Sequence, residues 1–328
     1  MKCLAAIHES FGKPVEVLTA KEIEVGSPSS GQALVRLVRA SVNPSDLGMI
    51  GGSYGRLRTL PAVAGREGVG EVVEVGPGVS SVSVGDMVRI PEEPGVWAQY
   101  HLCAADSLMR LPGGLDPDML AMSFINPPTA LCVLDSFADL REGDWVIQNG
   151  AGSALGLFMI QLCAARGVKT VNMLRNASAK EAALKAMGAD VVVDEAAFDP
   201  KALKDLTGGA KPVLGLNQIG GASVSNMIRA VGDSATIVTV GGMVGDPVRF
   251  PTRFLIFNDL RLRGFWWDKW QRTHSEAEVA ALFEKIFALV GRGVLKAPVD
   301  SVFPISEVKS AMLRASEGGR SGKVMLGF

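Results

Sequence analysis

Three closely spaced glycines, Gly150, Gly152 and Gly156, give the first indication of chemistry in this sequence. They follow a short apolar run beginning at Trp145, which is typical of a buried strand, and they precede an apolar segment over residues 153–166 that is typical of a helix. A strand, a glycine turn and a helix together present backbone N–H groups and a helix N-terminus to a pyrophosphate. The pattern therefore favours nucleotide binding.

The spacing of these glycines is GxGxxxG, which has one residue more before the last glycine than the usual dinucleotide fingerprint. Glycines also end helices and form tight turns where no ligand binds, so the triplet alone leaves that alternative open. The residues around the triplet have to decide between the two interpretations.

The end of the second strand of a dinucleotide fold distinguishes the two nicotinamide cofactors. An acid there binds the ribose 2′-hydroxyl, whereas an arginine accepts a 2′-phosphate. The strand expected over residues 170–174 is followed by Arg175, and no acid occurs before Glu181. We therefore predict NADPH rather than NADH, with a solvated arginine at a strand end as the alternative.

A second glycine turn follows the strand expected over residues 236–240. It consists of Val240, Gly241, Gly242 and Met243. In a parallel sheet this turn lies at the same carboxyl edge as the first one, and ligands bind outside that edge. An ordinary turn at the end of a strand is the alternative interpretation.

Length and composition limit the function classes. A chain of 328 residues suits two domains, and 33 basic against 34 acidic residues, a net charge of −1, give no field that would attract nucleic acid. The four cysteines lack CxxC spacing, which indicates buried free thiols in a reducing compartment. The start, MKCLAAIHE, resembles neither a signal peptide nor a transit peptide, and no apolar run is long enough for a bilayer. We expect a cytoplasmic protein whose partners are small molecules or its own copies.

The order of expected elements predicts two domains. Residues 1–118 read as β-rich, with short strands between Gly/Pro turns, whereas strands and helices alternate from residue 145 onward. This alternation is typical of a doubly wound parallel sheet, so the fold class is α/β. The last residues return to strand patterns but are too few for a domain. We expect them to complete the first domain, which gives 1–118 with 296–328, and 119–295.

Local signals place several helix boundaries. Pro127 and Pro128 interrupt an apolar segment, so a helix is expected to resume only after them. Ser178 and Ser275 each precede a glutamate by three residues, the spacing of a capping box at a helix N-terminus.

The whole chain resembles the medium-chain dehydrogenase/reductase superfamily. Zinc-dependent members have a cysteine in the segment that matches NPSD and a histidine in the segment that matches GRE; this chain has Asn43 and Arg66 at those positions and no CxxCxxC lobe. The resemblance therefore implies the zinc-free branch and no metal. It also implies a Rossmann-type domain beside a discontinuous GroES-like catalytic domain.

Within that branch, the chain resembles the 2-enoyl thioester reductases of mitochondrial-type fatty acid synthesis. The resemblance rests on the strings VNPSDLGMIGGSYG, FINPPTAL, VIQNGAGSALG, TVGGM, LIFNDLRLRGFWWDKW and SGKVML. It implies NADPH as cofactor, a CoA or acyl-carrier-protein thioester as substrate, and a homodimer.

The resemblance assigns the proton donor to Tyr54, one of only two tyrosines in the chain. Hydride addition to C3 of an enoyl thioester leaves enolate charge on the thioester oxygen, and C2 must then gain a proton. A phenol stays protonated at neutral pH and can stabilise that oxygen or supply the proton. On its own, a tyrosine in a Gly/Ser loop would be a packing or surface residue.

The same comparison assigns the remaining site residues. The cofactor contacts that it implies are Asn126, Gly152, Ser153, Ala154, Leu155, Arg175, Val240, Gly241, Gly242, Met243, Phe265, Trp266, Trp267 and Lys323. It places Asn43 and Trp97 along the substrate cleft, with ordinary core packing as the alternative for Trp97. An aromatic cluster at a subunit contact is the alternative for residues 265–267.

Two departures from the family pattern bear on function. The family usually has Arg-x-Arg at the 2′-phosphate site, whereas this chain has Arg175 and then Ala177, which weakens the expected preference for NADPH. Leu131 stands where an aromatic residue is common, which can reshape the acyl pocket. A quinone or general enone reductase, and a dinucleotide-binding protein without turnover, therefore stay open as alternatives.

Overall fold

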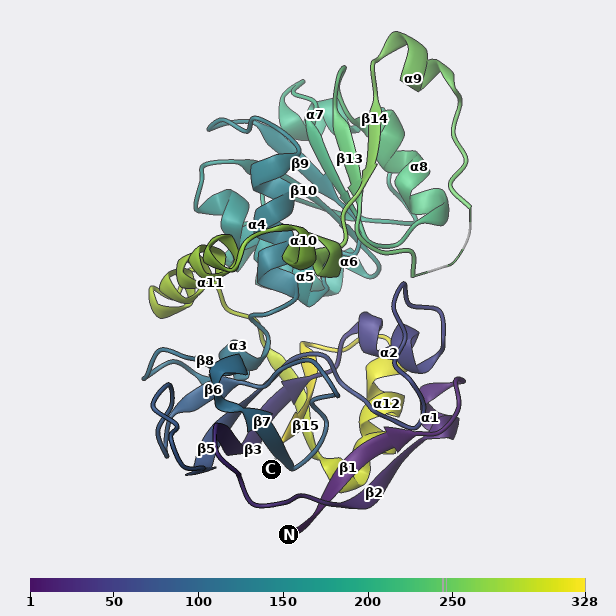
Figure 1. The fold of residues 1–328 in the computed structure, drawn as a ribbon. Helices are drawn as coiled ribbons and strands as arrows, with labels where there is room; N and C mark the ends of the chain where they lie inside the picture. Colours follow the sequence, from purple (N-terminus) through teal and green to yellow (C-terminus); the bar gives the residue numbers. More distant parts are fainter. Residues whose placement is uncertain (244, 246, 328) are drawn as a thin grey trace. The chain divides into compact units, whose positions relative to one another are not determined.

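The computed structural model describes residues 1–243, 245 and 247–327, and the chain divides into two compact units (Figure 1). Unit 1 comprises Met1–Phe124 and Ala297–Phe328, and unit 2 comprises Ile125–Lys296. Unit 1 therefore joins the N-terminal segment and the C-terminal tail, and unit 2 is one continuous stretch of chain between them.

Unit 2 is built on a six-stranded sheet in which every described pairing is parallel. Its spatial order is β11-β10-β9-β12-β13-β14, so the strand order reverses between β9 and β12. This is the Rossmann order, and it confirms the predicted doubly wound sheet. The strands are β9 (Trp145–Gln148), β10 (Lys169–Leu174), β11 (Val191–Asp194), β12 (Leu214–Asn217), β13 (Thr236–Thr239) and β14 (Arg261–Gly264).

Helices cover both faces of this sheet, because alternate strand residues point to opposite sides. Val171 and Met173 pack in one apolar cluster with Val224 and Met227 of α8, whereas Leu174 belongs to a second cluster with residues of α5 and α6. The helices of unit 2 are α4 (Asn126–Ser136), α5 (Ala154–Ala164), α6 (Ala177–Ala186), α7 (Leu203–Thr207), α8 (Gly221–Ala230), α9 (Arg253–Phe257), α10 (Trp267–Thr273) and α11 (Glu276–Gly291).

Two predicted helix starts are wrong, and one is confirmed. Helix α4 begins at Asn126, so Pro127 and Pro128 lie inside its first turn, where a missing N–H costs no helical hydrogen bond. Helix α6 begins before Ser178, and its first N–H, that of Ala177, donates to Oδ2 of Asp194 at 3.3 Å. A neighbouring strand thus supplies the acceptor that was expected from Ser178. The capping box of Ser275 with Glu278 is present at the start of α11.

The described strands of unit 1 form two sheets. Strands β2, β1 and β4 form the smaller one, and the larger one has the order β15-β16-β3-β5-β6-β8, with β7 also paired to β3. The strands are β1 (Lys2–His8), β2 (Leu18–Glu24), β3 (Gln32–Ser41), β4 (Ala62–Val63), β5 (Gly68–Val75), β6 (Met87–Arg89), β7 (Tyr100–Ala104), β8 (Met109–Arg110), β15 (Val299–Pro304) and β16 (Lys323–Gly327). Its short helices are α1 (Pro14–Val17), α2 (Pro44–Ile50), η1 (Ala105–Ser107), α3 (Pro117–Ala121), η2 (Ile305–Glu307) and α12 (Val308–Ser316).

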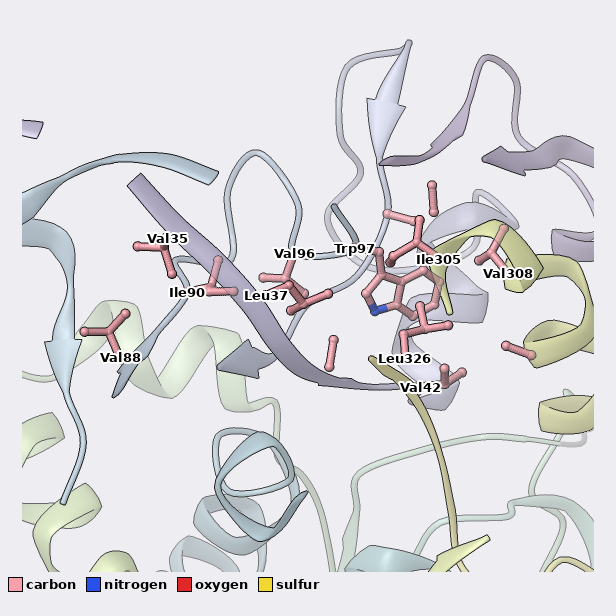
Figure 2. Packing of buried hydrophobic residues seen from close by; sticks show 14 of the residues in the cluster. Val35, Leu37, Val42, Val88, Ile90, Val96, Trp97, Ile305, Val308 and Leu326 are labelled. Atoms are coloured by element: carbon pink, nitrogen blue, oxygen red, sulfur yellow. The ribbon is translucent and has the colours of Figure 1, made fainter. Parts of the chain in front are cut away.

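One apolar core holds unit 1 together across its two chain segments. Figure 2 shows Trp97 among three aliphatic side chains, which are Leu37 of β3, Ile305 of η2 and Leu326 of β16. Residues far apart in sequence therefore share this core. Burial of such aliphatic side chains contributes about 1.5–3 kcal/mol each. Among the described residues, no helix combines the length and the apolar composition needed to cross a membrane.

Candidate active site

The glycine turn after β9 depends on glycine at two positions. Gly150 has a φ of +61°, a conformation that residues with a side chain rarely adopt. A β-carbon on Gly156 would lie 2.6 Å from the carbonyl oxygen of Ala151, so only glycine lets α5 begin this close to the strand. The side chain of Ser153 caps α5 by accepting a 3.0 Å hydrogen bond from the N–H of Gly156.

Buried amides connect this turn to the end of β12, the neighbouring strand across the reversal in strand order. The Ser153 hydroxyl donates to Oε1 of Gln218 at 2.8 Å, and the Gln218 amide donates to the carbonyl oxygen of Asn149 at 3.0 Å. Asn149 in turn donates to Oδ1 of Asn217 at 2.8 Å. Sequence reasoning missed these three amide side chains. Their signal is the run of polar residues that directly follows each apolar strand, QN after WVI and NQ after LGL.

Positive charge lies beside the first glycine turn. Arg175 follows β10 and is exposed, as a contact to a 2′-phosphate requires. A β-carbon on Gly152 would lie 3.5 Å from Nζ of Lys180, so this lysine of α6 reaches back over the turn. Lys180 was not predicted, because its place depends on how α6 folds against the glycine turn. The glycine turn thus has a cation, Lys180, close to Gly152, in addition to Arg175 directly after β10.

The second glycine turn, after β13, lies against the same amide-lined edge of the sheet. The N–H of Val240 donates to the carbonyl oxygen of Asn217 at 2.9 Å. A β-carbon on Gly241 would lie 2.8 Å from the carbonyl oxygen of Gln218, whereas one on Gly242 would meet nothing within 4 Å. Met243 is 62% exposed. Gly241 therefore serves a close approach between two turns, and Gly242 and Met243 leave open surface beside it.

The remaining predicted cofactor residues of unit 2 differ in their surroundings. Asn126 begins α4 and is largely buried. Phe265 makes an edge contact with Phe137 at 6.1 Å between ring centroids, and the Arg272 guanidinium lies 5.3 Å from the Trp266 ring.

Trp267 is buried in an aromatic cluster of unit 2 itself. Its ring stacks on Trp270 at 5.2 Å and meets the edge of Phe283 at 6.1 Å between centroids. The Trp267 side chain therefore packs within its own chain, and a contact of this residue with the cofactor stays a prediction.

In unit 1, the predicted proton donor Tyr54 lies in the loop after α2. Its backbone N–H donates to the carbonyl oxygen of Gly48 at 3.2 Å, which ties the loop to the helix. Its phenol oxygen accepts a 2.6 Å hydrogen bond from Nη1 of Arg66. The guanidinium carbon of Arg66 lies 4.7 Å from the centre of the Tyr54 ring. The phenol is therefore held by a charged partner that sequence reasoning had considered only as a non-ligand of zinc.

The predicted residues Asn43 and Lys323 meet in a buried polar cluster of unit 1. The Asn43 amide nitrogen donates to Oγ of Ser41 at 2.8 Å and to Oε1 of Glu67 at 2.7 Å, and Lys323 donates to the Asn43 amide oxygen. Oε2 of Glu67 accepts from the N–H of Phe124 at 3.1 Å.

Asp46 completes this cluster by accepting a 2.7 Å hydrogen bond from the N–H of Asn43. Burial raises the pKa of Asp46 to about 7, although that hydrogen bond opposes the rise. Burial also lowers the pKa of Lys323, which the carboxylates of Glu67 and Asp46 counteract.

Asn43 and Arg66 stand where the resemblance implies a cysteine and a histidine in zinc-dependent members, and their side chains do not fit zinc. The Asn43 amide is engaged at both ends, and Arg66 carries a guanidinium that offers no lone pair. Within the described part of the chain, no group of three or more His, Cys, Asp or Glu side chains could hold a metal ion.

Trp97 has no exposed surface and packs in the unit 1 core (Figure 2). A β-carbon on Gly65 would lie 2.2 Å from its ring, so the indole fills the space that this glycine leaves. These contacts agree with the packing alternative, and a role of Trp97 in a substrate cleft stays a prediction.

Comparison with known proteins places this geometry in a family. The sequence model described as "Alcohol dehydrogenase GroES-like domain" matches residues 29–113, and the one described as "Zinc-binding dehydrogenase" matches residues 154–285. The chain is 35% identical over 97% of its length to the mitochondrial enoyl-[acyl-carrier-protein] reductase of Dictyostelium discoideum, covering 92% of that protein. It is 36% identical over 98% of its length to the one of Bos taurus, covering 88% of it. The chain belongs to the enoyl reductase family of the medium-chain dehydrogenase/reductase superfamily.

Solved structures agree with membership in the enoyl reductase family. The complex of Etr1p with NADP and crotonyl-CoA matches with a TM-score of 0.90 at 26% identity, covering all of both chains. A protein of Bacillus thuringiensis described as an NADPH:quinone reductase also matches with a TM-score of 0.90, at 25% identity, over 100% of this chain and 99% of the other. The predicted resemblance and fold are confirmed.

Proposed function

We propose that this protein reduces the C2=C3 double bond of 2-enoyl thioesters with NADPH. The observation that carries this proposal is the phenol of Tyr54, which the charged hydrogen bond from Arg66 holds in a chain of the enoyl reductase family. The relatives are named enoyl-[acyl-carrier-protein] reductases, and one similar structure contains NADP and crotonyl-CoA. The substrate is therefore a CoA or acyl-carrier-protein ester.

Reduction requires one hydride and one proton. Bound NADPH supplies the hydride, which adds to C3 and leaves the electron pair of the double bond as enolate charge. The phenol of Tyr54 donates the proton to C2 or stabilises the enolate oxygen, and solvent returns the proton to Tyr54 afterwards. The products are the saturated thioester and NADP⁺.

The residues of unit 2 suit a dinucleotide phosphate. Backbone N–H groups at the start of α5 would face the pyrophosphate, and Gly152 leaves its outer side open toward Lys180. Arg175 would pair with the 2′-phosphate through charge-assisted hydrogen bonds. Asn126, Val240, Gly241, Gly242 and Met243 are the further cofactor contacts in this proposal, with Phe265 and Trp266.

Specific observations bear on two alternative functions, one in favour and one against. The similar structure described as an NADPH:quinone reductase supports a quinone or enone reductase, which needs the same hydride transfer without an acyl thioester. A dinucleotide-binding protein without turnover would need no oriented phenol, so the bond from Arg66 to Tyr54 argues against it.

NADPH oxidation, followed with crotonyl-CoA, a longer enoyl thioester and a small quinone, separates these functions. We expect turnover with the thioesters and a loss of about 100-fold in kcat for Tyr54→Phe. Tyr100→Phe removes the other phenol of the chain and serves as the matched control. If only the quinone turns over and Tyr54→Phe is unchanged, the thioester proposal is wrong. NADPH binding without turnover of any acceptor would support the binding protein.

We also propose that the protein is a homodimer joined through β14. This strand is the last one in its sheet and all its residues are exposed, while Ile256 and Phe257 of the preceding helix α9 are 70% and 79% exposed. The N–H of Arg261 donates to the carbonyl oxygen of Ala235, which directly precedes β13. Since successive N–H groups of a strand point to opposite sides, the N–H of Leu262 points away from β13.

Light scattering after size exclusion tests the dimer. Leu262→Pro removes the outward N–H and is expected to yield monomers, whereas Leu262→Val keeps it and is expected to stay dimeric. A dimeric proline variant would place the interface elsewhere.

A cytoplasmic location stays a prediction from the N-terminal residues, and the relatives named above are mitochondrial by name. The four cysteines are free, which suits a reducing compartment without requiring the cytoplasm. Fractionation of cells that express the untagged chain, with a marker of the mitochondrial matrix as reference, decides between the cytoplasm and mitochondria.

A further inference from the structure

A buried arginine holds the phenol of Tyr54. The side chain of Arg66 is only 1% exposed, and it makes a forked ion pair with Glu92, at 2.8 Å from Nε and 3.3 Å from Nη2. Its Nη1 donates to the Tyr54 oxygen at 2.6 Å. Burying a guanidinium is costly unless it is paired, so Glu92 both compensates the charge and fixes the direction of the third donor.

The surrounding loops add to this rigidity. Arg58, which is also buried, donates to the carbonyl oxygens of Val63, Gly65 and Glu92 at 2.7–3.0 Å. These bonds connect the loop that contains Tyr54 to two residues just before Arg66 and to Glu92. The phenol and the guanidinium therefore belong to one cross-linked set of loops within unit 1.

We propose that Arg66 is a positioning residue for Tyr54, which orients the phenol for proton donation and stabilises the negative charge left on its oxygen. This inference rests on the function proposed above. A guanidinium has donors and no acceptor, so in this contact the Tyr54 oxygen accepts and its own O–H proton points away from Arg66. When the proton leaves, the oxygen becomes anionic beside a fixed cation, and the bond becomes charge-assisted at both ends.

The sequence assigned no role to Arg66 and indicated only that this residue cannot bind zinc. Its contact with Tyr54 gives it a part in the reaction instead, because it acts on the acid and not on the substrate. Glu92 neutralises most of the charge of Arg66, and Arg58 forms a second ion pair with Glu93 nearby. The effect of Arg66 is therefore local to the hydrogen bond that it donates to Tyr54.

A double-mutant cycle tests the inference. Arg66→Met removes the charge and the donor but keeps the length of the side chain, Arg66→Lys keeps the charge, and each is combined with Tyr54→Phe. Arg56→Met is the control, because Arg56 lies in the loop that contains Tyr54 but pairs with Glu93, and its side chain is 47% exposed. Crotonyl-CoA reduction is measured as a function of pH, and thermal unfolding checks that each variant is folded.

We expect Arg66→Met to lower kcat by about 10- to 100-fold while KM for crotonyl-CoA changes less than about 3-fold. The fall of kcat at alkaline pH should move upward by about one pH unit, because the phenol loses the cation that favours its ionised form. Arg66→Lys should recover part of the rate, and Arg56→Met should match the wild type. In the Tyr54→Phe background, Arg66→Met should change kcat less than about 2-fold.

An equal loss of kcat with and without the Tyr54→Phe substitution, or an unmoved alkaline limb in a folded Arg66→Met variant with lowered kcat, overturns the inference. Failure of the proposed function looks different. If the proposed function is wrong, Tyr54→Phe alone leaves thioester reduction unchanged, whatever the effect of the Arg66 substitutions.

Discussion

Lys323 in β16 donates its ammonium hydrogen bond to the side-chain oxygen of Asn43 at the start of α2, across 280 residues of sequence. One of these residues was assigned to the cofactor and the other to the substrate cleft, and the structure brings them into direct contact. The carboxyl groups of Glu67 and Asp46 lie near the same contact and oppose the fall that burial causes in the pKa of Lys323. The C-terminal strand is thereby connected to the start of α2, the helix that precedes the loop of Tyr54.

Removal of this ammonium group should destabilise unit 1. Lys323→Met leaves the Asn43 oxygen and two buried carboxyl groups without their cation, so we expect a loss of about 3 kcal/mol in the free energy of unfolding. Urea unfolding at neutral pH measures it. Lys309→Met, on an exposed position of α12, should change stability by less than about 0.5 kcal/mol. Equal effects of the two variants would mean that the cluster does not depend on the Lys323 charge.

Arg175 should distinguish the two nicotinamide cofactors. Arg175→Ala is expected to raise KM for NADPH by about 10-fold and to leave KM for NADH within about 2-fold, because only NADPH has the 2′-phosphate. Lys185→Ala, on the exposed side of α6, is the control. Steady-state kinetics with both cofactors measures the effect, and equal changes for both would remove Arg175 from the 2′-phosphate site.

Lys180 should behave differently from Arg175. Its ammonium group lies over the glycine turn, where a pyrophosphate common to both cofactors would bind. Lys180→Ala should therefore raise KM for NADPH and NADH by similar factors, about 5-fold each. An effect confined to NADPH would instead place Lys180 at the 2′-phosphate, as a substitute for the arginine that the family usually has there.

Gly156 is required by packing. A β-carbon there would lie 2.6 Å from the carbonyl oxygen of Ala151, and neither backbone can yield cheaply. Gly156→Ala should lower the free energy of unfolding by more than about 2 kcal/mol and weaken NADPH binding. Gly242→Ala meets nothing within 4 Å and should leave stability unchanged in thermal unfolding. A stable Gly156→Ala variant would show that α5 can move away from the turn.

Acid should destabilise unit 1 through His101. Burial lowers the pKa of this imidazole from 6.5 to about 4, although hydrogen bonds to backbone carbonyls oppose the change. Between those pH values the unfolded chain binds a proton that the folded chain does not, so folding free energy is lost as the pH falls from 6.5 to 4. The loss amounts to at most about 3 kcal/mol.

His101→Gln should remove this part of the acid sensitivity in chemical unfolding measured from about pH 7 to about pH 4. His274→Gln retains His101 and serves as the control. An unchanged pH dependence in His101→Gln would mean that other groups govern the acid sensitivity.

The elements that sequence predicted are those with local signals. The parallel sheet followed from short apolar strands such as Trp145–Gln148, each succeeded by a helix pattern, and the capping box at Ser275 needed only neighbouring residues. The start of α6 was mispredicted because its acceptor, Asp194, comes from another strand.

The contacts that organise the site could not be read from sequence. Gln218 reaches Ser153 only because β12 lies beside β9, and Arg66 reaches Tyr54 only through the folding of two loops. Both depend on strand order and loop conformation, which no local pattern of residues encodes. The resemblance to a family identified Tyr54, but it gave no partner for it.

The position of β16 between β15 and β3 has a consequence for synthesis on the ribosome. The strands of unit 1 that are made first cannot close their sheet until Lys323–Gly327 has left the exit tunnel, whereas unit 2 is complete by Lys296. Until then Arg39–Ser41 of β3, which pair with β16, lack this neighbour, whereas Gln32–Arg36 of the same strand can already pair with β7. Asn43, at the start of the helix that precedes the Tyr54 loop, therefore receives its hydrogen bond from Lys323 only after all of unit 2 has been made.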